Sequence, residues 1–370
     1  MLNKLMILIL LSFFLFVNTF SQEDNNNSTL QEVKIAGTQL IHIHSGITGE
    51  NYDLYINLPR DYKDTTKTFP AIYLIDAQWD FPLVSAIYGQ QYYDGFLPSA
   101  VVIGITWSGK NPDYDSLRAR DFTPTSAGKP AKYGNASNFL QSIKAEIIPL
   151  VEKNYRVSPD ERTLMGSSFG GLFTLYTLFN EASVFSRYVL TSPAILFDNS
   201  VINKYEKNYS EKNSGLPVKL YIAIGSYEDT ALLQKFVDKI KSRNYDGLKF
   251  QNDVIENKGH SGAKAEGYSR GLQFVFNRPY IKLDPQILEQ YAGTYQYDSR
   301  NKVRLVIEND HLTFTSPEDR KFILWATTPQ GFFCKGFYGL VHFQKDEKGR
   351  VKGFEFEQYT GKTFIPKIEK

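Results

Sequence analysis

The sequence has little of two residue types that protein chemistry often uses, cysteine and histidine. Its 370 residues contain one cysteine, Cys334, and five histidines. A single cysteine excludes an intramolecular disulfide and a cysteine-rich zinc site, and five scattered histidines leave little for a metal site built from imidazoles. We therefore expect no metal. A mechanism that requires an imidazole must choose among His42, His44, His260, His311 and His342.

The chain also lacks an excess of charge of either sign. Lys and Arg number 42 against 40 Asp and Glu, which gives a formal net charge of +2. This balance does not favour nucleic acid or an anionic membrane as the main partner. The hydrophobic fraction of 42% is that of a globular protein. The length predicts two domains, because single cores stop growing near ~250 to 300 residues.

An apolar run at the N-terminus is typical of a cleaved export signal. Lys4 precedes the run at residues 5–17, and small residues follow at positions 19–21. The run is shorter than the ~17 to 25 residues that a membrane-spanning helix needs. We expect a signal peptide over residues 1–21 and a disordered polar lead-in over residues 22–33. The mature chain would then be periplasmic or secreted, with no transmembrane segment.

Residues 34–280 carry the pattern of an α/β domain. Apolar runs alternate with helical patterns in the order typical of a mostly parallel sheet with crossover helices. The short connection between the first two strands predicts that they are antiparallel. The expected strands are Thr38 to His44, Tyr52 to Leu58, Ala71 to Ile75, Val101 to Thr106, Thr163 to Gly166, Tyr188 to Thr191, Val218 to Gly225 and Lys249 to Ile255. The expected helices are Ser137 to Lys153, Phe169 to Phe179, Thr230 to Ser242 and Ala263 to Phe276.

Residues 283–370 carry a different pattern, of short alternating segments separated by turn residues. No helix of length is expected after Tyr291, so the segments predict a small antiparallel β-domain of barrel or sandwich type. Pro279 would end the preceding helix and so mark the boundary. The expected strands are Val303 to Ile307, Leu312 to Thr315, Phe322 to Ala326, Gly331 to Cys334, Leu340 to Gln344 and Val351 to Glu357.

A serine between glycines is the strongest chemical signal. The stretch Gly166-Ser167-Ser168-Phe169-Gly170 follows an apolar strand directly and precedes an apolar helix. In that context the G-x-S-x-G spacing predicts a sharp strand-to-helix turn that presents a nucleophilic hydroxyl above the sheet. The spacing selects Ser168 rather than Ser167. The alternative is a glycine-rich turn without a catalytic role.

A serine nucleophile needs a base, and the few histidines make the choice. His42 and His44 lie on the first expected strand, while His311 and His342 belong to the β-domain. His260 follows the last strand of the α/β domain, which is where the chain order serine, acid, histidine places the base.

A carboxylate after the preceding strand should orient the imidazole. Glu228 and Asp229 both follow the strand that ends at Gly225. We favour Glu228, because Asp229 also suits the N-cap of the next helix.

Two backbone N–H groups should stabilise the oxyanion of a reacting carbonyl. We expect one from Phe169, directly after the nucleophile, and one from Gln78, in the polar turn after the third strand. Trp79 and Trp107 also lie at expected strand ends. They could wall a substrate pocket or simply pack in the core.

These motifs together resemble one esterase family of the α/β-hydrolase superfamily, which includes esterase D, enterochelin esterases and mycolyltransferases. Asp76-Ala77-Gln78 resembles its strand-end Asp-Gly signature, with Ala77 in place of the usual glycine. Residues 118–124 resemble the Arg-Asp-Tyr-Thr-Pro stretch of a secreted or periplasmic branch. Residues 287–295 resemble, more weakly, a β-domain appended to some serine hydrolases. Further similar stretches are Glu146 to Pro149, Gly166 to Leu172 and Ser192-Pro193.

The resemblance, which covers roughly residues 40–277, implies an α/β-hydrolase fold, a triad of Ser168, Glu228 and His260, no cofactor, and cleavage of ester bonds. We expect an exported serine esterase whose substrate is a small-molecule or carbohydrate ester, such as a siderophore ester. An acyltransferase and a non-catalytic polysaccharide-binding or partner-binding protein on the same fold are the alternatives. Arg118 could bind substrate near Ser168 or could fix a long loop, whereas Arg120 is expected to pair with a nearby carboxylate such as Asp121.

Overall fold

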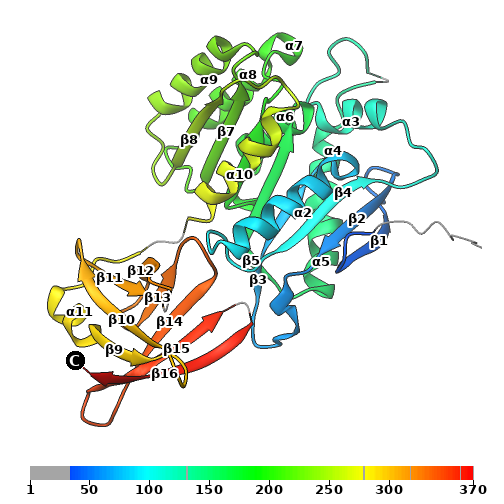
Figure 1. Ribbon diagram of the computed structural model, residues 1–370. Helices are drawn as coiled ribbons and strands as arrows, with labels where there is room; N and C mark the ends of the chain where they lie inside the picture. The colour runs from blue at the N-terminus through cyan, green and yellow to red at the C-terminus, as the bar shows by residue number, and fades with distance from the viewer. Residues whose placement is uncertain (1–33, 131, 278–279, 317, 359, 370) are drawn as a thin grey trace, which may run out of the picture. The chain divides into compact units, whose positions relative to one another are not determined.

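The computed structural model describes residues 34–369 except residues 131, 278–279, 317 and 359 (Figure 1). The expected signal peptide and lead-in, residues 1–33, lie outside the described residues. Packing divides the chain into residues 1–36 and residues 37–370. Residues 34–36 form no helix or strand, and every element below belongs to the second unit.

An eight-stranded sheet forms the centre of the α/β region, in the order β1-β2-β4-β3-β5-β6-β7-β8 (Figure 1). β2 is antiparallel to both β1 and β4, and the remaining neighbours are parallel. The mostly parallel sheet with an antiparallel lead-in is therefore confirmed. The strands are β1 (Thr38–His44), β2 (Asn51–Asn57), β3 (Phe69–Leu74), β4 (Val101–Trp107), β5 (Val157–Ser167), β6 (Arg187–Thr191), β7 (Lys219–Gly225) and β8 (Lys249–Ile255).

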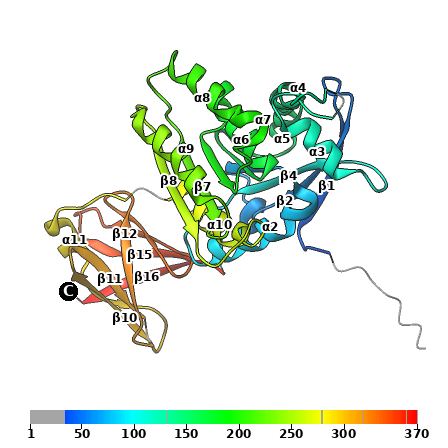
Figure 2. The ribbon, with the colours of Figure 1, turned by 90° about the horizontal axis from the view of Figure 1, so that it is seen from above.

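Helices cover both faces of this sheet. α2 (Ala77–Tyr93) and α10 (Ala263–Val275) pack side by side on one face, as Figures 1 and 2 show. Because both faces are covered, β3 and β4 are buried along their whole length, as parallel strands usually are. The opposite face is covered by α4 (Ala136–Ser142), η2 (Ile143–Ile147), α5 (Ile148–Asn154), α6 (Phe169–Asn180), α8 (Ile202–Ser210) and α9 (Thr230–Ser242). Smaller elements are η1 (Arg60–Lys63), α3 (Tyr114–Phe122), η3 (Ala182–Val184) and α7 (Phe197–Ser200).

Several features of the α/β region differ from the sequence expectation, and α8 was also not among the expected helices. The polar turn expected after β3 is the first turn of the seventeen-residue helix α2. The stretch around Arg118, expected as a loop, is the helix α3. The single helix expected at residues 137–153 is interrupted by the wider π turn η2, where Glu146 accepts hydrogen bonds from the hydroxyls of Ser45 and Ser142.

The C-terminal region is a closed antiparallel barrel of eight strands, as the alternating segments predicted. The two strands that close it, β9 and β16, pair with each other and were not among the expected strands. The strands are β9 (Gly293–Gln296), β10 (Lys302–Glu308), β11 (His311–Thr315), β12 (Lys321–Ala326), β13 (Gly331–Cys334), β14 (Gly339–Lys345), β15 (Val351–Gln358) and β16 (Gly361–Glu369), preceded by the short helix α11 (Pro285–Tyr291).

The barrel has its own aromatic core. Tyr291 of α11 stacks on Phe343 with ring centroids 3.9 Å apart, and Phe343 also contacts Phe332 and Phe354. Cys334 is buried in the same cluster. Alternate residues of each strand therefore fill the interior, which makes the barrel a packed core rather than a channel.

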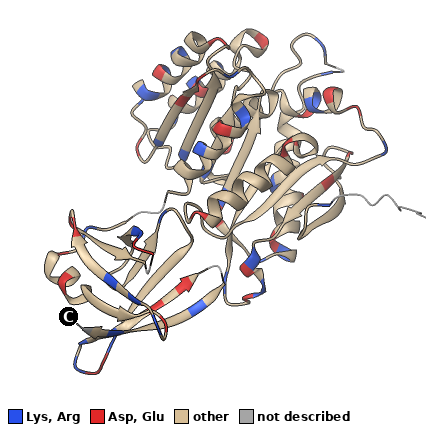
Figure 3. Cartoon of the chain, in the orientation of Figure 1, with Lys and Arg blue, Asp and Glu red and all other residues tan. Residues whose placement is uncertain are grey.

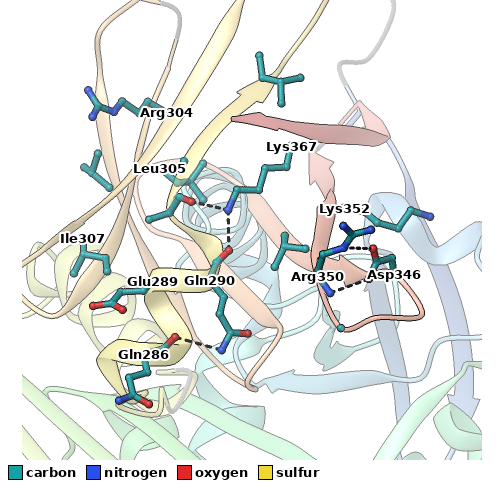
Figure 4. A pocket seen from close by; sticks show the side chains of 16 residues that line it. Gln286, Glu289, Gln290, Arg304, Leu305, Ile307, Asp346, Arg350, Lys352 and Lys367 are labelled. Carbon is teal, nitrogen blue, oxygen red and sulfur yellow. Dashed lines mark hydrogen bonds and ion pairs between the residues drawn. The ribbon is translucent and has the colours of Figure 1, made fainter. Parts of the chain in front are cut away.

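A shallow groove of about 1060 Å³ runs along the outside of the barrel, between α11, β10, β15 and β16 (Figure 4). Some of its charged groups are paired with each other or with the backbone. Arg350 pairs with Asp346, and Lys367 donates to the carbonyl oxygens of Gln290 and Ala292. None of the expected catalytic residues lines it.

Charge is spread evenly over the described residues. Figure 3 shows basic and acidic residues interspersed on the helices of the α/β region, in keeping with the small net charge. Within the described ranges, no helix has the length and apolarity to cross a membrane. The same residues contain no cluster of three or more His, Cys, Asp or Glu placed to hold a metal ion.

Candidate active site

Ser168 lies at the turn between β5 and α6. Its backbone dihedrals are φ 58° and ψ −120°, a conformation that costs energy in a residue with a Cβ. The turn is possible because Gly166 and Gly170 have no Cβ, so their backbones can approach closely. A Cβ on Gly166 would lie 2.6 Å from the carbonyl carbon of Gly170. The local sequence thus forces a strained turn that leaves Ser168 partly exposed.

His260 and Glu228 meet at the same edge of the sheet. His260 follows β8 and Glu228 follows β7, and His260 Nδ1 lies 2.6 Å from Glu228 Oε2. The other carboxylate oxygen, Oε1, accepts hydrogen bonds from Ser192 Oγ at 2.7 Å and from the Gly225 N–H at 2.9 Å. Both oxygens of Glu228 are therefore occupied, and the carboxylate is held in one orientation.

These contacts also set the charge of Glu228. Burial opposes ionisation, but hydrogen bonds from Ser192, His260 and the Gly225 N–H outweigh it and lower the pKa of the carboxyl below its ordinary value. An ionised acceptor at Nδ1 favours the tautomer that carries its proton there, which leaves Nε2 free to accept a proton.

Asp229 is differently placed, although it is the next residue along the chain. Its side chain accepts a hydrogen bond from the Leu232 N–H at 2.9 Å and so caps the N-terminus of α9. The structure therefore separates the two carboxylates considered from the sequence. Glu228 contacts the imidazole, and Asp229 satisfies a helix terminus.

Ser168 and Glu228 are linked through the loop after β6. The Ser168 N–H donates to the carbonyl oxygen of Thr191, and the neighbouring Ser192 donates to Glu228. Among the described residues, no hydrogen bond joins Ser168 Oγ to His260. Catalytic hydrogen bonds of this kind are often long without substrate and tighten when it binds.

The two expected oxyanion donors occupy helix N-termini. Phe169 is the first residue of α6, and Gln78 is the second residue of α2. N–H groups in the first turn of a helix have no partner within the helix, and the helix dipole favours negative charge there. For the N–H groups of Phe169 and Gln78 no hydrogen bond is found within the described part of the chain.

The Gln78 side chain is fixed by its neighbours. Its Oε1 accepts a hydrogen bond from Thr106 Oγ1 at 2.8 Å, and its Nε2 donates to Asp76 Oδ1 at 3.3 Å. Both contacts hold the first turn of α2 against β4 and the end of β3. The backbone N–H of Gln78 is thus carried on a rigid element.

Arg118 makes a bidentate ion pair with Asp76. Its Nε and Nη2 donate to the two carboxylate oxygens at 3.0 and 2.8 Å. The Arg118 side chain is 14% exposed, and its guanidinium lies within 6 Å of the rings of Trp79, Phe122 and Phe169. Burial opposes its charge, but the hydrogen bonds to Asp76 outweigh this and raise the pKa of Arg118. This arrangement agrees with a role in fixing the turn at Asp76.

The two tryptophans differ in exposure. Trp79 is 47% exposed and packs edge-on against Tyr114. Trp107 is 3% exposed, and its Nε1 donates to Asp121, so it is part of the core. Asp121 also pairs with Arg120, as expected from the sequence.

Two groups near Ser168 were missed by the sequence reasoning. One is Ser192, whose hydroxyl holds Glu228; its position at the end of β6 was the available signal. The other is a cluster of rings formed by Tyr133, Phe169 and Phe197, with centroids 5.6 to 6.5 Å apart. These rings come from segments far apart in the sequence, so no local pattern could predict the cluster. The other four histidines lie on β1, β11 and β14.

Comparison with known proteins gives one family. The family described as "Putative esterase" matches residues 45–245, a range that includes Ser168 and Glu228 and ends before His260. Ferri-bacillibactin esterase BesA of Bacillus subtilis is 26% identical over 275 residues, which are 68% of this chain and 94% of that protein. The siderophore triacetylfusarinine C esterase of Aspergillus fumigatus is 29% identical over 169 residues, which are 44% of this chain and 58% of that protein.

The fold has close counterparts among solved structures. The crystal structure of the BES protein from Bacillus cereus superposes with a TM-score of 0.61 at 26% identity. The match covers 68% of this chain and 99% of that chain. The esterase part of the present chain is thus equivalent to nearly all of that protein.

Proposed function

Since the chain belongs to this esterase family and is a carboxylic ester hydrolase, we propose that it is an exported serine esterase that acts through an acyl-enzyme on Ser168. The observation that carries the proposal is the 2.6 Å contact between His260 Nδ1 and Glu228, at the same sheet edge as the strained turn at Ser168. An oriented imidazole beside a presented serine is the arrangement that activates a hydroxyl for attack on a carbonyl.

In the acylation step, Ser168 Oγ attacks the ester carbonyl while His260 Nε2 takes the hydroxyl proton. The carbonyl oxygen becomes an oxyanion, which the N–H groups of Phe169 and Gln78 stabilise. Glu228 stabilises the imidazolium that forms. The C–O bond of the ester then breaks, and His260 delivers its proton to the leaving alcohol.

In the deacylation step, His260 takes a proton from water, which attacks the acyl carbonyl on Ser168. The second oxyanion occupies the same two N–H groups. Its collapse releases the acid and returns the proton to Ser168. An acyltransferase would differ only by using an alcohol of a second substrate in place of this water.

We propose siderophore-type esters as the substrate class and acylated carbohydrates as the second class to be tested. The names of the two relatives above, a ferri-bacillibactin esterase and a siderophore triacetylfusarinine C esterase, support the first class. Exposed aromatic surface at Trp79, together with the ring cluster at Phe169, suits acyl groups that carry an aromatic ring.

Hydrolysis of p-nitrophenyl acetate by the wild type and by Ser168→Ala tests the mechanism. We expect the substitution to lower kcat by about 10⁴-fold or more, because it removes the nucleophile. Ser167→Ala is the matched control, since Ser167 neighbours the nucleophile but is buried, and it should retain activity. Equal rates for the wild type and Ser168→Ala would refute the serine mechanism and favour a non-catalytic binding protein.

A panel of siderophore, feruloyl and acetyl-xylan esters, compared by kcat/KM, tests the substrate class. We expect the highest values for a siderophore ester. Adding an alcohol acceptor to the same reactions distinguishes an acyltransferase, because transfer would produce a new ester at the expense of the free acid.

A further inference from the structure

The first two turns of α2 contain a buried carboxylate that the mechanism above does not use. Asp80 is 3% exposed, although an isolated charge is costly to bury. It lies two residues after Gln78, the expected oxyanion donor. Its two oxygens accept hydrogen bonds from Lys264 Nζ at 2.8 Å and from the Tyr268 hydroxyl at 3.0 Å.

Both partners of Asp80 belong to α10, the helix that follows the base. Lys264 lies four residues after His260, in the first turn of α10, and Tyr268 lies one turn further on. Burial raises the pKa of Tyr268 well above its ordinary value, so the hydroxyl keeps its proton and donates to Asp80. The contact thus joins α2, whose first turn contains the oxyanion donor Gln78, to α10, which begins just after the base His260.

Asp80 also completes a balanced set of four charges. Asp76 is the N-cap residue that precedes α2, and Asp80 lies in the first turn of the helix. Asp76 is paired with Arg118 of α3, and Asp80 with Lys264 of α10. Two ion pairs therefore hold the N-terminal end of α2. The cation of one belongs to α3, and the cation of the other belongs to α10.

We propose that Asp80 and Lys264 are positioning residues, which fix the N–H of Gln78 on α2 relative to His260 before α10. This inference rests on the proposed function, because it gives Gln78 and His260 the roles stated above. Neither Asp80 nor Lys264 needs to touch the substrate.

General packing of the two helices does not require this pair. Further along, Gln91 of α2 donates to Ser269 of α10 at 2.8 Å, and Phe81 and Leu272 belong to a shared apolar core. The Asp80 contact also fixes the distance between the N-terminal ends of α2 and α10. The reacting atoms would lie at these ends. A displacement of about 1 Å there can lower a rate by 10²-fold.

The test compares Lys264→Met with Ser269→Ala, which removes one of the distal contacts between the same helices. Titration with an organophosphonate counts competent sites, so kcat is expressed per active serine. We expect Lys264→Met to lower kcat at least about 10-fold while KM changes less than about threefold, because the displacement acts on the transition state. Ser269→Ala should stay within about twofold of the wild type, since its contact is remote from the reacting atoms.

A trifluoromethyl ketone provides a second readout. Ser168 Oγ adds to the ketone carbon, His260 takes the hydroxyl proton, and the former carbonyl oxygen becomes an oxyanion. We expect Lys264→Met to weaken ketone affinity by the same factor as kcat/KM. The conservative variant Lys264→Arg, which retains the pairing charge, should recover most of both.

If Lys264→Met does not fold, the double variant Asp80→Asn/Lys264→Met decides, because it leaves no unpaired buried charge. A folded double variant with reduced kcat and ketone affinity supports the proposal. Normal kcat per titrated site in Lys264→Met or in the double variant overturns it while the esterase function stands. Absence of ester hydrolysis by the wild type would instead overturn the proposed function.

Discussion

Glu228 and Asp229 are neighbours in the chain, but their side chains have different surroundings. Glu228 receives three hydrogen bonds that orient it toward His260, whereas Asp229 caps α9. The sequence could favour Glu228 only because Asp229 suits a helix cap. The sequence could not reveal the role of Ser192, because its hydroxyl reaches Glu228 only when the strands lie side by side.

Substitution of the two carboxylates should separate activity from stability. We expect Glu228→Gln to lower kcat by about 10²- to 10⁴-fold, because the amide no longer orients and stabilises the imidazolium. Asp229→Asn should leave kcat nearly unchanged and alter the free energy of unfolding by less than about 1 kcal/mol, since asparagine is also a good N-cap. Ester hydrolysis and urea unfolding measure the two effects. A larger loss of activity in Asp229→Asn would assign the acid to Asp229.

The lowered pKa of Glu228 predicts how stability depends on pH. Because the carboxyl has a lower pKa in the folded chain, its contribution is fully present above the ordinary value and is lost as pH falls through the folded value. Between about pH 5 and pH 3, the wild type should lose stability more steeply than Glu228→Gln. Urea unfolding at several pH values measures the slopes. Equal slopes would show that Glu228 titrates alike in both states.

Cys334 should be chemically silent in the folded protein. It is 1% exposed in the barrel core, and burial raises the pKa of its thiol to about 12. Reaction with a disulfide reagent at pH 8 should therefore require unfolding, because the thiolate is the reactive form. Labelling measured with and without denaturant tests this. Rapid labelling of native protein would mean that the barrel opens readily.

At the scale of elements, the best-predicted segments are those whose pattern is local. The strands β1 and β8 and the helices α6, α9 and α10 begin and end within a residue or so of their expected bounds, because apolar runs and caps mark them.

The helix α2 was missed, although its buried apolar residues show helical spacing. They are Ala77, Phe81, Val84, Tyr88 and Tyr92, at intervals of four and three residues. Pro82, which lies inside the helix, argued against a helix in the sequence. Similarly, Asp113 is the N-cap of α3, and its side chain accepts a hydrogen bond from the Ser116 N–H. The sequence analysis did not use this capping residue to predict the helix.

Two helical glycines should respond oppositely to alanine. A Cβ on Gly271 of α10 would overlap Val189 and lie 2.7 Å from Tyr221 Cδ1, whereas one on Gly89 of α2 meets nothing within 4 Å. We expect Gly271→Ala to destabilise the fold by about 1 to 3 kcal/mol through overpacking. Gly89→Ala should stabilise it by up to about 1 kcal/mol, because alanine has less backbone freedom to lose. Denaturant unfolding compares them. Equal effects would contradict the close approach of α10 to the sheet.

At the scale of the whole molecule, the two patterns in the sequence correspond to two architectures, a mixed sheet with helices and a closed barrel. The sequence predicted an antiparallel barrel or sandwich, but it could not identify the strand pairing that closes the barrel. Closure depends on pairing between β9 and β16, which lie at opposite ends of the segment, and long-range pairing leaves no local signal. The short segment of β9 and the exposed residues of β16 also lack strong alternation.

We expect the esterase chemistry to reside in the first of two domains, residues 34–280, because every residue assigned to the site lies there. BesA and the BES protein match about two thirds of this chain over at least 94% of their own lengths. A chain that ends at Tyr280 should therefore keep kcat on p-nitrophenyl acetate within about threefold of the full chain, since a domain with its own core can fold alone. Organophosphonate titration corrects for any fraction that does not fold. A fully titrated short chain with kcat lowered more than about tenfold would mean that the barrel shapes the site, and residues 283–370 would then belong to the catalytic unit.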